Sequence, residues 1–199
     1  MPDALRVGDD VVDLDDPAIA TSRLRPRFVE RVCSDIERAS LGAASDPKTL
    51  LWIFFAAKEA AYKIVAKVGP PPGFAHRRFV VTPDLRSVHY EGLALGLRVE
   101  VEGGCVHAVA TMGTGTPLVG HGLVDPGVSP GSEARRLLCM AVARHLGCAS
   151  ERLAVVREPA PGTWDGFAPP VLVRDGRPSG VDVSLTHDGR FVGFAAAIG

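Results

Sequence analysis

The sequence has no long apolar run, no closely paired cysteines and no excess of charge of either sign. Its longest apolar run, from Leu50 to Ala57, is too short to cross a bilayer, and the first ten residues hold no apolar stretch typical of a signal peptide. The 22 Lys and Arg residues nearly balance the 23 Asp and Glu residues, so no general positive field attracts nucleic acid or an anionic membrane. We therefore expect a cytoplasmic protein that binds neither nucleic acid nor membranes.

The four cysteines include no CxxC pair and match neither a disulfide framework nor a standard zinc pattern. A zinc site built from cysteines and histidines has suitable atom types, but the spacings fit no standard motif. The residues considered for such a site are His107, His121, Cys139, His145 and Cys148. We expect all of them to be structural and the cysteines to be reduced.

Hydrophobic residues make up 46% of the 199-residue chain, enough to bury a substantial core. Hydrophobic periodicity predicts a strand over residues 6–14, a helix over 28–39 and a longer helix over 47–68. Within the first helix, Ser34 and Glu37 have the spacing of a capping box, which would start a new helix at Ser34. The first half is thus predicted to combine strands with helices.

The second half echoes the first. The string Val7–Asp13 (VGDDVVD) reappears as Val119–Asp125 (VGHGLVD), and Ala110–Gly113 (ATMG) reappears as Ala196–Gly199 (AAIG). An internal duplication would give an α+β fold of two pseudo-repeated units, each a small antiparallel sheet packed with helices. We expect these units to span residues 1–113 and 114–199.

Predicted hairpin turns give a slightly different alignment of the two halves. Gly103–Gly104 is expected to turn the chain into the strand over 105–112, and Asp188–Gly189 into the strand over 190–197. Aligning these two turns shifts the apolar alternation by one residue, which would exchange the two faces of a strand. The repeat and the turns therefore disagree by one position.

One charged residue interrupts an apolar face of the helix over 47–68. Glu59 lies on the same stripe as Leu51 and Phe55, and burying an unpaired carboxylate is costly. Two interpretations remain open. Glu59 and Lys63 form an ordinary ion pair at i, i+4 spacing, or the carboxylate has a chemical role.

A second carboxylate lies in the acidic string Asp9–Asp16, which in most proteins is only a solvated strand end. In the repeat, Asp10 corresponds to Gly122, so the fold itself does not require this carboxylate. Asp10 on a strand and Glu59 on a helix are the kind of ligands that Mg²⁺ uses, with water and phosphate oxygens in its other positions.

A third segment, VSLTHDGR at residues 183–190, ends in a hairpin signal. Here His187 is either a partly exposed residue at a strand end or, together with Ser184, a ligand for phosphate.

Three strings taken together resemble the 4′-phosphopantetheinyl transferase family: GDDVVD at residues 8–13, FAAKEAAYK at 55–63 and SLTHD at 184–188. The string RFVERVCS at 27–34 is also similar to the segment between the first two motifs of the short member, holo-acyl-carrier-protein synthase. The length and the repeat are instead similar to surfactin-type transferases, in which two units are fused. The resemblance implies a monomeric pseudodimer with one site between its units. In surfactin-type chains the serine–histidine motif lies in the first half, whereas here it lies in the last.

The resemblance implies transfer of the 4′-phosphopantetheine arm of coenzyme A to a serine of an acyl, polyketide or peptidyl carrier protein, with Mg²⁺ and release of 3′,5′-ADP. Asp10 and Glu59 would hold the metal. Glu59 would also take the serine proton, and Lys63 would stabilise the leaving group. The expected coenzyme A contacts are Lys58, Lys63, Ser184 and His187, with Arg177 or Arg190 assisting.

The sequence departs from the surfactin-type pattern at Val12, where those enzymes have a second acidic ligand, so we expect water there. Asp9 and Asp13 lie on the other strand face from Asp10 and are not expected to bind the metal. The acidic carrier is expected to dock on a basic patch. That patch would include Arg23, Arg25, Arg27 or Arg31.

Two other functions stay open. The chain is either a non-catalytic carrier-binding subunit with the same fold or a different metal-dependent phosphoesterase. Release of 3′,5′-ADP would exclude the first, and consumption of coenzyme A without a carrier acceptor would favour the second.

Overall fold

The structure is a computed structural model that describes residues 4–22, 25–69, 73, 75–161, 163 and 166–198. The elements of the first half are β1 (Arg6–Asp13), α1 (Pro17–Ser22), α2 (Pro26–Val32), α3 (Asp35–Ala43), α4 (Pro47–Val68), the 3-10 helix η1 (His76–Arg78), β2 (Val80–Val81), β3 (Ser87–Tyr90), β4 (Leu93–Glu102) and β5 (Cys105–Met112). Those of the second half are β6 (Leu118–Leu123), α5 (Pro130–Leu146), the 3-10 helix η2 (Ser150–Arg152), β7 (Leu153–Val156), β8 (Val171–Arg174), β9 (Arg177–Asp188) and β10 (Phe191–Ala197).

The two halves form separate five-stranded sheets with the same topology. The strand order is β1-β5-β4-β3-β2 in the first sheet and β6-β10-β9-β8-β7 in the second, and all neighbouring strands are antiparallel. A long helix precedes the outermost strand of each sheet, α4 before β2 and α5 before β7. The predicted α+β fold of two pseudo-repeated units is therefore confirmed.

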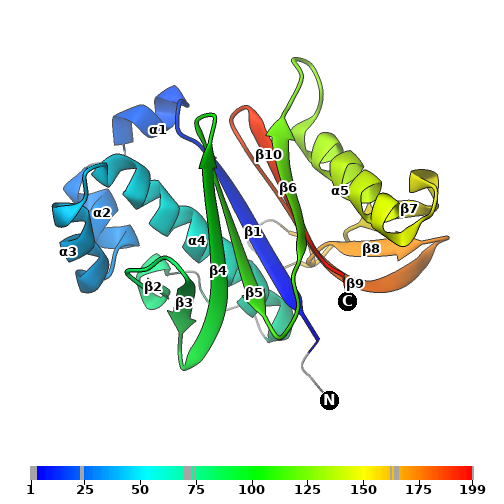
Figure 1. The fold of residues 1–199 in the computed structure, drawn as a ribbon, viewed down its shortest axis with the longest axis horizontal. Coiled ribbons are helices and arrows are strands. Elements are labelled where there is room, and N and C mark those ends of the chain that lie inside the picture. Colours follow the sequence, from blue (N-terminus) through cyan, green and yellow to red (C-terminus); the bar gives the residue numbers. More distant parts are fainter. Residues whose placement is uncertain are drawn as a thin grey trace.

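The sheets lie side by side in the middle of the molecule, with α4 packed on the first and α5 on the second (Figure 1). Side chains alternate between the two faces of each strand. On one face of the first sheet, Val12 and Ala108 join the core under α4. On the other face, Val7 and Val109 pack against Ala195 of β10. β1 and β5 are thus buried on both faces.

The second hairpin turn lies one residue later than predicted. Phe191 pairs directly with Asp188, so the turn is Gly189–Arg190, whereas the turn at Gly103–Gly104 is confirmed. Asp188 stays in its strand because its carboxylate accepts a hydrogen bond of 2.8 Å from the backbone N–H of Asp13. With the turn moved, the two hairpins align without the one-residue disagreement that the sequence suggested.

The predicted helix over 28–39 is divided into α2 and α3, and α3 begins at the predicted capping box. Ser34 precedes α3 and forms the predicted capping box with Glu37, whose Oε2 accepts from the Ser34 N–H at 2.7 Å. Asp46 caps α4 by accepting from the N–H of Thr49, and the bounds of α4 agree with the prediction. The four cysteines are free thiols, as predicted. Within the described residues, no helix is long and apolar enough to span a membrane.

Candidate active site

The two units meet where β1, an edge strand of the first sheet, faces β9 of the second. Alternate side chains of β9 accept hydrogen bonds from alternate backbone N–H groups of β1. The bonds are Val7 N to Asp182 Oδ2 (2.8 Å), Asp9 N to Ser184 Oγ (3.0 Å), Val11 N to Thr186 Oγ1 (3.3 Å) and Asp13 N to Asp188 Oδ2 (2.8 Å). Polar side chains therefore pair the edge of β1, a role that a neighbouring strand would otherwise fill.

Close packing of α4 on β1 depends on Gly8. A Cβ atom at this position would lie 2.0 Å from the carbonyl oxygen of Ala60 and 3.2 Å from Cγ1 of Ile64. Because only glycine leaves this space open, the helix approaches the strand closely enough for its lysines to reach the β1 backbone. Lys67 Nζ donates to the Val7 carbonyl at 2.7 Å.

Asp10 projects from β1 toward α4 and has partners from both units. Lys63 Nζ donates to Asp10 Oδ1 at 3.1 Å and to the Asp9 carbonyl at 2.6 Å. Thr186 Oγ1 of β9 donates to the same Asp10 oxygen at 2.9 Å. The site therefore lies at the junction of the units.

Electrostatics links Asp10 to Glu59. Burial and, to a smaller extent, the negative charge of Glu59 raise the pKa of Asp10 to about 6 against the lowering effect of Lys63. Burial lowers the pKa of Lys63, but the negative charges of Asp10, Asp9 and Glu59 together outweigh burial and raise this pKa overall. Two carboxylates that repel each other beside one ammonium group form a site where a bound cation would be stabilised.

Glu59 also contacts a residue that the sequence did not single out. Its Oε1 lies 3.3 Å from Nε2 of His76, which belongs to η1. The His76 ring stacks on Phe55, one turn earlier in α4, with ring centroids 5.0 Å apart. His76 follows α4 after the segment 69–75, so no helical spacing could have connected it with Glu59.

Lys58 points away from this site. Its Nζ donates to Glu37 Oε2 at 2.6 Å and to the Val32 carbonyl at 2.7 Å, and its side chain is 0% exposed. Glu37 Oε1 also accepts from the Val81 N–H at 2.8 Å. The predicted contact between Lys58 and coenzyme A does not fit this position, because the ammonium group is enclosed among α2, α3, α4 and β2. Neighbouring helix residues project about 100° apart, so Glu59 and Lys58 face different surroundings.

The structure also separates Ser184 from His187. These residues lie on opposite faces of β9, since their numbers differ by an odd count. Ser184 is buried and accepts from the Asp9 N–H, whereas His187 is exposed. Thr186, which shares the Ser184 face, is the residue of this motif that contacts Asp10. Alternation along the strand was the signal that could have identified it.

Arg190 holds the junction together at the end of β1. Its Nε and one terminal nitrogen donate to the two carboxylate oxygens of Asp13 at 2.8 and 2.7 Å, and it also bonds to Asp15. These hydrogen bonds lower the pKa of Asp13 to about 2 against the effect of burial. Arg177, the other assisting residue that was predicted, is exposed at the start of β9.

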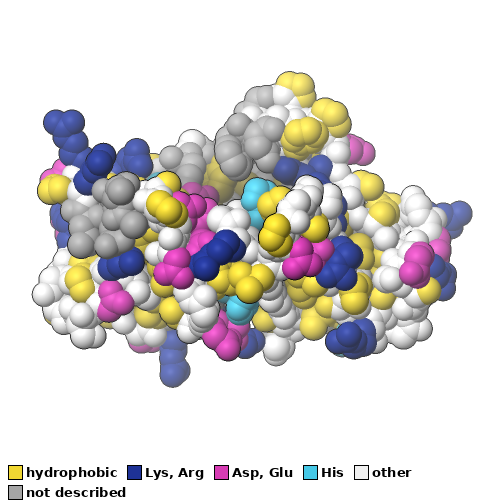
Figure 2. Space-filling model, turned by 90° about the horizontal axis from the view of Figure 1, so that it is seen from above, with side chains coloured by type: hydrophobic (Ala, Val, Ile, Leu, Met, Phe, Trp, Pro, Cys, Tyr) yellow, Lys and Arg dark blue, Asp and Glu magenta, His cyan; other side chains and the backbone are white. Residues whose placement is uncertain are grey.

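A basic pocket lies next to Glu59. Its lining consists of Arg27, Glu30, Arg31, Ala75, His76 and Arg77. Because His76 contacts both the pocket and Glu59, the arginines adjoin the carboxylate. Several Lys and Arg side chains project at this end of the molecule, over the helices of the first unit (Figure 2). Arg25 is exposed just before α2, and Arg23 lies outside the described residues.

Comparisons with known proteins agree with the first-unit motifs. Residues 6–89, which include Asp10, Glu59 and Lys63, match the family model of the 4′-phosphopantetheinyl transferase superfamily. The resemblance noted in the sequence is thereby confirmed over these residues. One solved structure that the chain resembles is the crystal structure of holo-[acyl-carrier-protein] synthase from Thermotoga maritima, with 13% identity, 90% of this chain and 86% of that chain covered, and a TM-score of 0.39. No curated protein sequence gives a significant match.

Proposed function

Because residues 6–89 match this superfamily, we propose that the protein is a Mg²⁺-dependent 4′-phosphopantetheinyl transferase acting on a carrier protein. The observation that carries the proposal is the junction cluster, in which Asp10 bonds to Lys63 of α4 and Thr186 of β9 and interacts with the charge of Glu59. We also propose that residues 1–113 and 114–199 are the two units. One chain then contains a whole site, so the enzyme is expected to act as a monomer.

Asp10 and Glu59 would hold the Mg²⁺ ion. Among the described residues, the side-chain hydrogen bonds of Asp10 go to Oδ1, so Oδ2 is the atom suited to ligate the metal. Two carboxylates with remaining positions for water and phosphate oxygens suit this cation. Position 12, on the same face of β1 as Asp10, is a valine buried in the core under α4, so it supplies no third carboxylate. When bound, the ion would supply positive charge at the pyrophosphate of coenzyme A.

The protein's own residues account for the remaining steps. Glu59 would accept the proton of the carrier serine as its oxygen attacks the phosphorus attached to pantetheine. A new serine–phosphorus bond forms while the bond to the oxygen of 3′,5′-ADP breaks. Lys63 would stabilise the charge on that departing oxygen. His76 would hold Glu59 in place through their contact of 3.3 Å.

The carrier would dock beside Glu59, on the pocket that includes Arg27, Arg31 and Arg77. Carriers of this family are acidic, and opposite charge speeds encounter and orients the partner. Docking there would bring the acceptor serine to the carboxylate that removes its proton. The carriers to test are those of fatty acid, polyketide and peptide synthesis.

Intact-mass spectrometry of apo carrier proteins incubated with the protein, coenzyme A and Mg²⁺ tests the proposal. We expect one carrier class to gain the mass of a single phosphopantetheine arm, and EDTA to abolish the gain. Glu59→Gln should keep the fold, as judged by circular dichroism, and lose the transfer. No gain on any carrier would favour a non-catalytic carrier-binding subunit. Loss of coenzyme A without a modified carrier would favour a phosphoesterase.

A further inference from the structure

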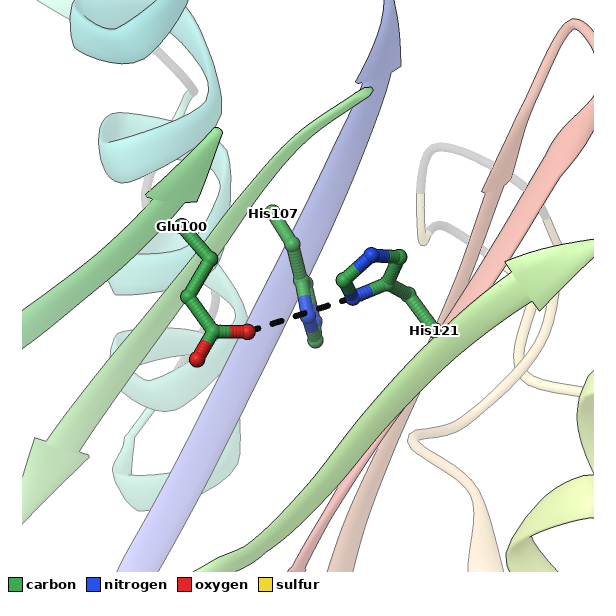
Figure 3. A group of neighbouring side chains, drawn as sticks. All are labelled: Glu100, His107 and His121. Carbon is green, nitrogen blue, oxygen red and sulfur yellow. Dashed lines mark ion pairs between the residues drawn. The ribbon is translucent and has the colours of Figure 1, made fainter. Parts of the chain in front are cut away.

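Three side chains with metal-ligating atoms converge on the side of the first sheet that faces the second unit. Glu100 of β4 and His107 of β5 are direct cross-strand partners, and His121 comes from β6. One ligand atom from each lies within 4.8 Å of the other two. Figure 3 shows the side chains pointing toward one another from their three strands, with an ion pair of 4.0 Å between Glu100 Oε2 and His121 Nδ1.

We propose that Glu100, His107 and His121 form a binding site for a transition metal ion of the Zn²⁺ type, which would link the two units. The site is separate from the Asp10 and Glu59 pair, because His107 lies on the face of the first sheet turned away from α4. Two imidazoles and one carboxylate are the ligands that zinc sites with an open fourth position use, and imidazole disfavours Mg²⁺.

His107 contacts the carboxylate of Asp9, which is the kind of partner that a metal-binding histidine usually has on its other ring nitrogen. His107 Nε2 lies 3.3 Å from Asp9 Oδ2, and the two side chains are only 1% and 0% exposed. With the Nε2 proton of His107 donated to the Asp9 carboxylate, the lone pair of Nδ1 would be available to a metal.

Neighbouring side chains also orient the other two ligands, Glu100 and His121. Arg98 donates to Oε1 of Glu100, so Oε2 is the oxygen turned to His121. The His121 ring packs edge-on against the His107 ring, with ring centroids 5.2 Å apart. The side chains of His121 and Glu100 are 19% and 39% exposed, so an ion can enter from solvent.

Small adjustments would complete the geometry. Ligand atoms around a tetrahedral zinc ion lie roughly 3.4 Å apart, given metal–ligand bonds of about 2.1 Å. The ligand atoms lie within 4.8 Å of one another, so rotations of the partly exposed Glu100 and His121 side chains toward the buried His107 would bring them to this spacing. Gly193 is the strand partner of His121 and leaves room for the Asp9 carboxylate. A Cβ atom at this position would lie 3.1 Å from Asp9 Oδ2.

A cobalt titration tests the site. The full chain is purified without a histidine tag, stripped of metal and titrated with Co²⁺ in excess Mg²⁺, which occupies the carboxylate pair. We expect one Co²⁺ per chain, a visible d–d absorption band, displacement by Zn²⁺ and a higher melting temperature. No saturable Co²⁺ binding by the unchanged protein would overturn the proposal.

Matched variants locate the binding. His121→Gln and Glu100→Gln each remove one partly exposed ligand and should lower the Co²⁺ affinity by about 100-fold or more. His145→Gln, at an exposed histidine of α5, and Glu59→Gln should leave the affinity unchanged. Equal affinity in His121→Gln and the unchanged protein would disprove the site. Loss of binding in Glu59→Gln alone would assign the Co²⁺ to the carboxylate pair instead.

Discussion

Thr186 donates a hydrogen bond of 2.9 Å to Asp10 across the junction of the two sheets, although the two residues are 176 positions apart in the chain. The same Thr186 oxygen accepts from the Val11 N–H. A hydroxyl of the second unit thus both pairs the edge of β1 and orients a carboxylate of the first. This bond is the most direct link between the duplicated architecture and the proposed chemistry.

Replacing Thr186 with valine keeps the shape and removes the hydroxyl. Because a hydrogen bond to a charged group contributes about 1.5–3 kcal/mol, we expect kcat/KM for carrier modification to fall by roughly tenfold to a hundredfold. Thr186→Ser should retain most activity, since it keeps the donor. Steady-state kinetics at several Mg²⁺ concentrations measures the effect. Equal rates for the valine and serine variants would show that the bond to Asp10 has no role in transfer.

The raised pKa of Asp10 predicts a pH dependence. Since this carboxyl has a pKa of about 6 without metal, it is protonated below that pH and binds cations weakly. We expect the Mg²⁺-dependent rate to fall as the pH decreases through about 6, and extra Mg²⁺ to move the midpoint lower. A rate that stays constant down to pH 5 would contradict the assignment of Asp10.

The same carboxyl affects the stability of the metal-free protein. Its pKa is higher in the folded chain than the unfolded value of about 4, so the folded state holds a proton that the unfolded state releases. Asp10 therefore stabilises the folded state fully below about pH 4, and this stabilisation is lost as the pH rises through about 6. Asp10→Asn should remove this part of the pH dependence in urea denaturation.

The buried pair of Lys58 and Glu37 predicts a structural defect. Lys58→Met leaves the Glu37 carboxylate buried without its cation, which should lower the free energy of unfolding by about 3–5 kcal/mol. The double variant Lys58→Met/Glu37→Gln should recover part of this loss because no charge remains buried. Lys48→Met, in the first turn of the same helix, is the control for removal of a lysine. A Lys58→Met protein of normal stability that fails to bind coenzyme A would show that Lys58 contacts coenzyme A.

The ion pair between Arg190 and Asp13 predicts that acid lowers the stability of the protein. Hydrogen bonds from Arg190 lower the pKa of Asp13 to about 2, so the stability they provide is present above pH 4 and is lost as the pH falls toward 2. Arg190→Gln should reduce the urea midpoint at pH 7, and the difference from the unchanged protein should shrink at pH 3 and below. A difference that is constant with pH would show that the ion pair is not the cause.

The sequence by itself determined the features that depend on near neighbours. The capping box of Ser34 and Glu37, the bounds of α4 and the strings around Asp10 and Glu59 could all be identified, because a helix start or a motif is specified within a few residues. The repeat also predicted two similar units. Each of these signals comes from local spacing or from the order of elements.

Only the tertiary structure decided where the side chains of those elements point. Lys58 adjoins Glu59 in sequence, yet packing against α3 buries it beside Glu37. Likewise, Thr186 reaches Asp10, and His121 approaches His107, because two sheets from separate halves of the chain face each other. No local pattern encodes such distances, since they depend on how closely whole elements pack, as α4 does on β1 at Gly8.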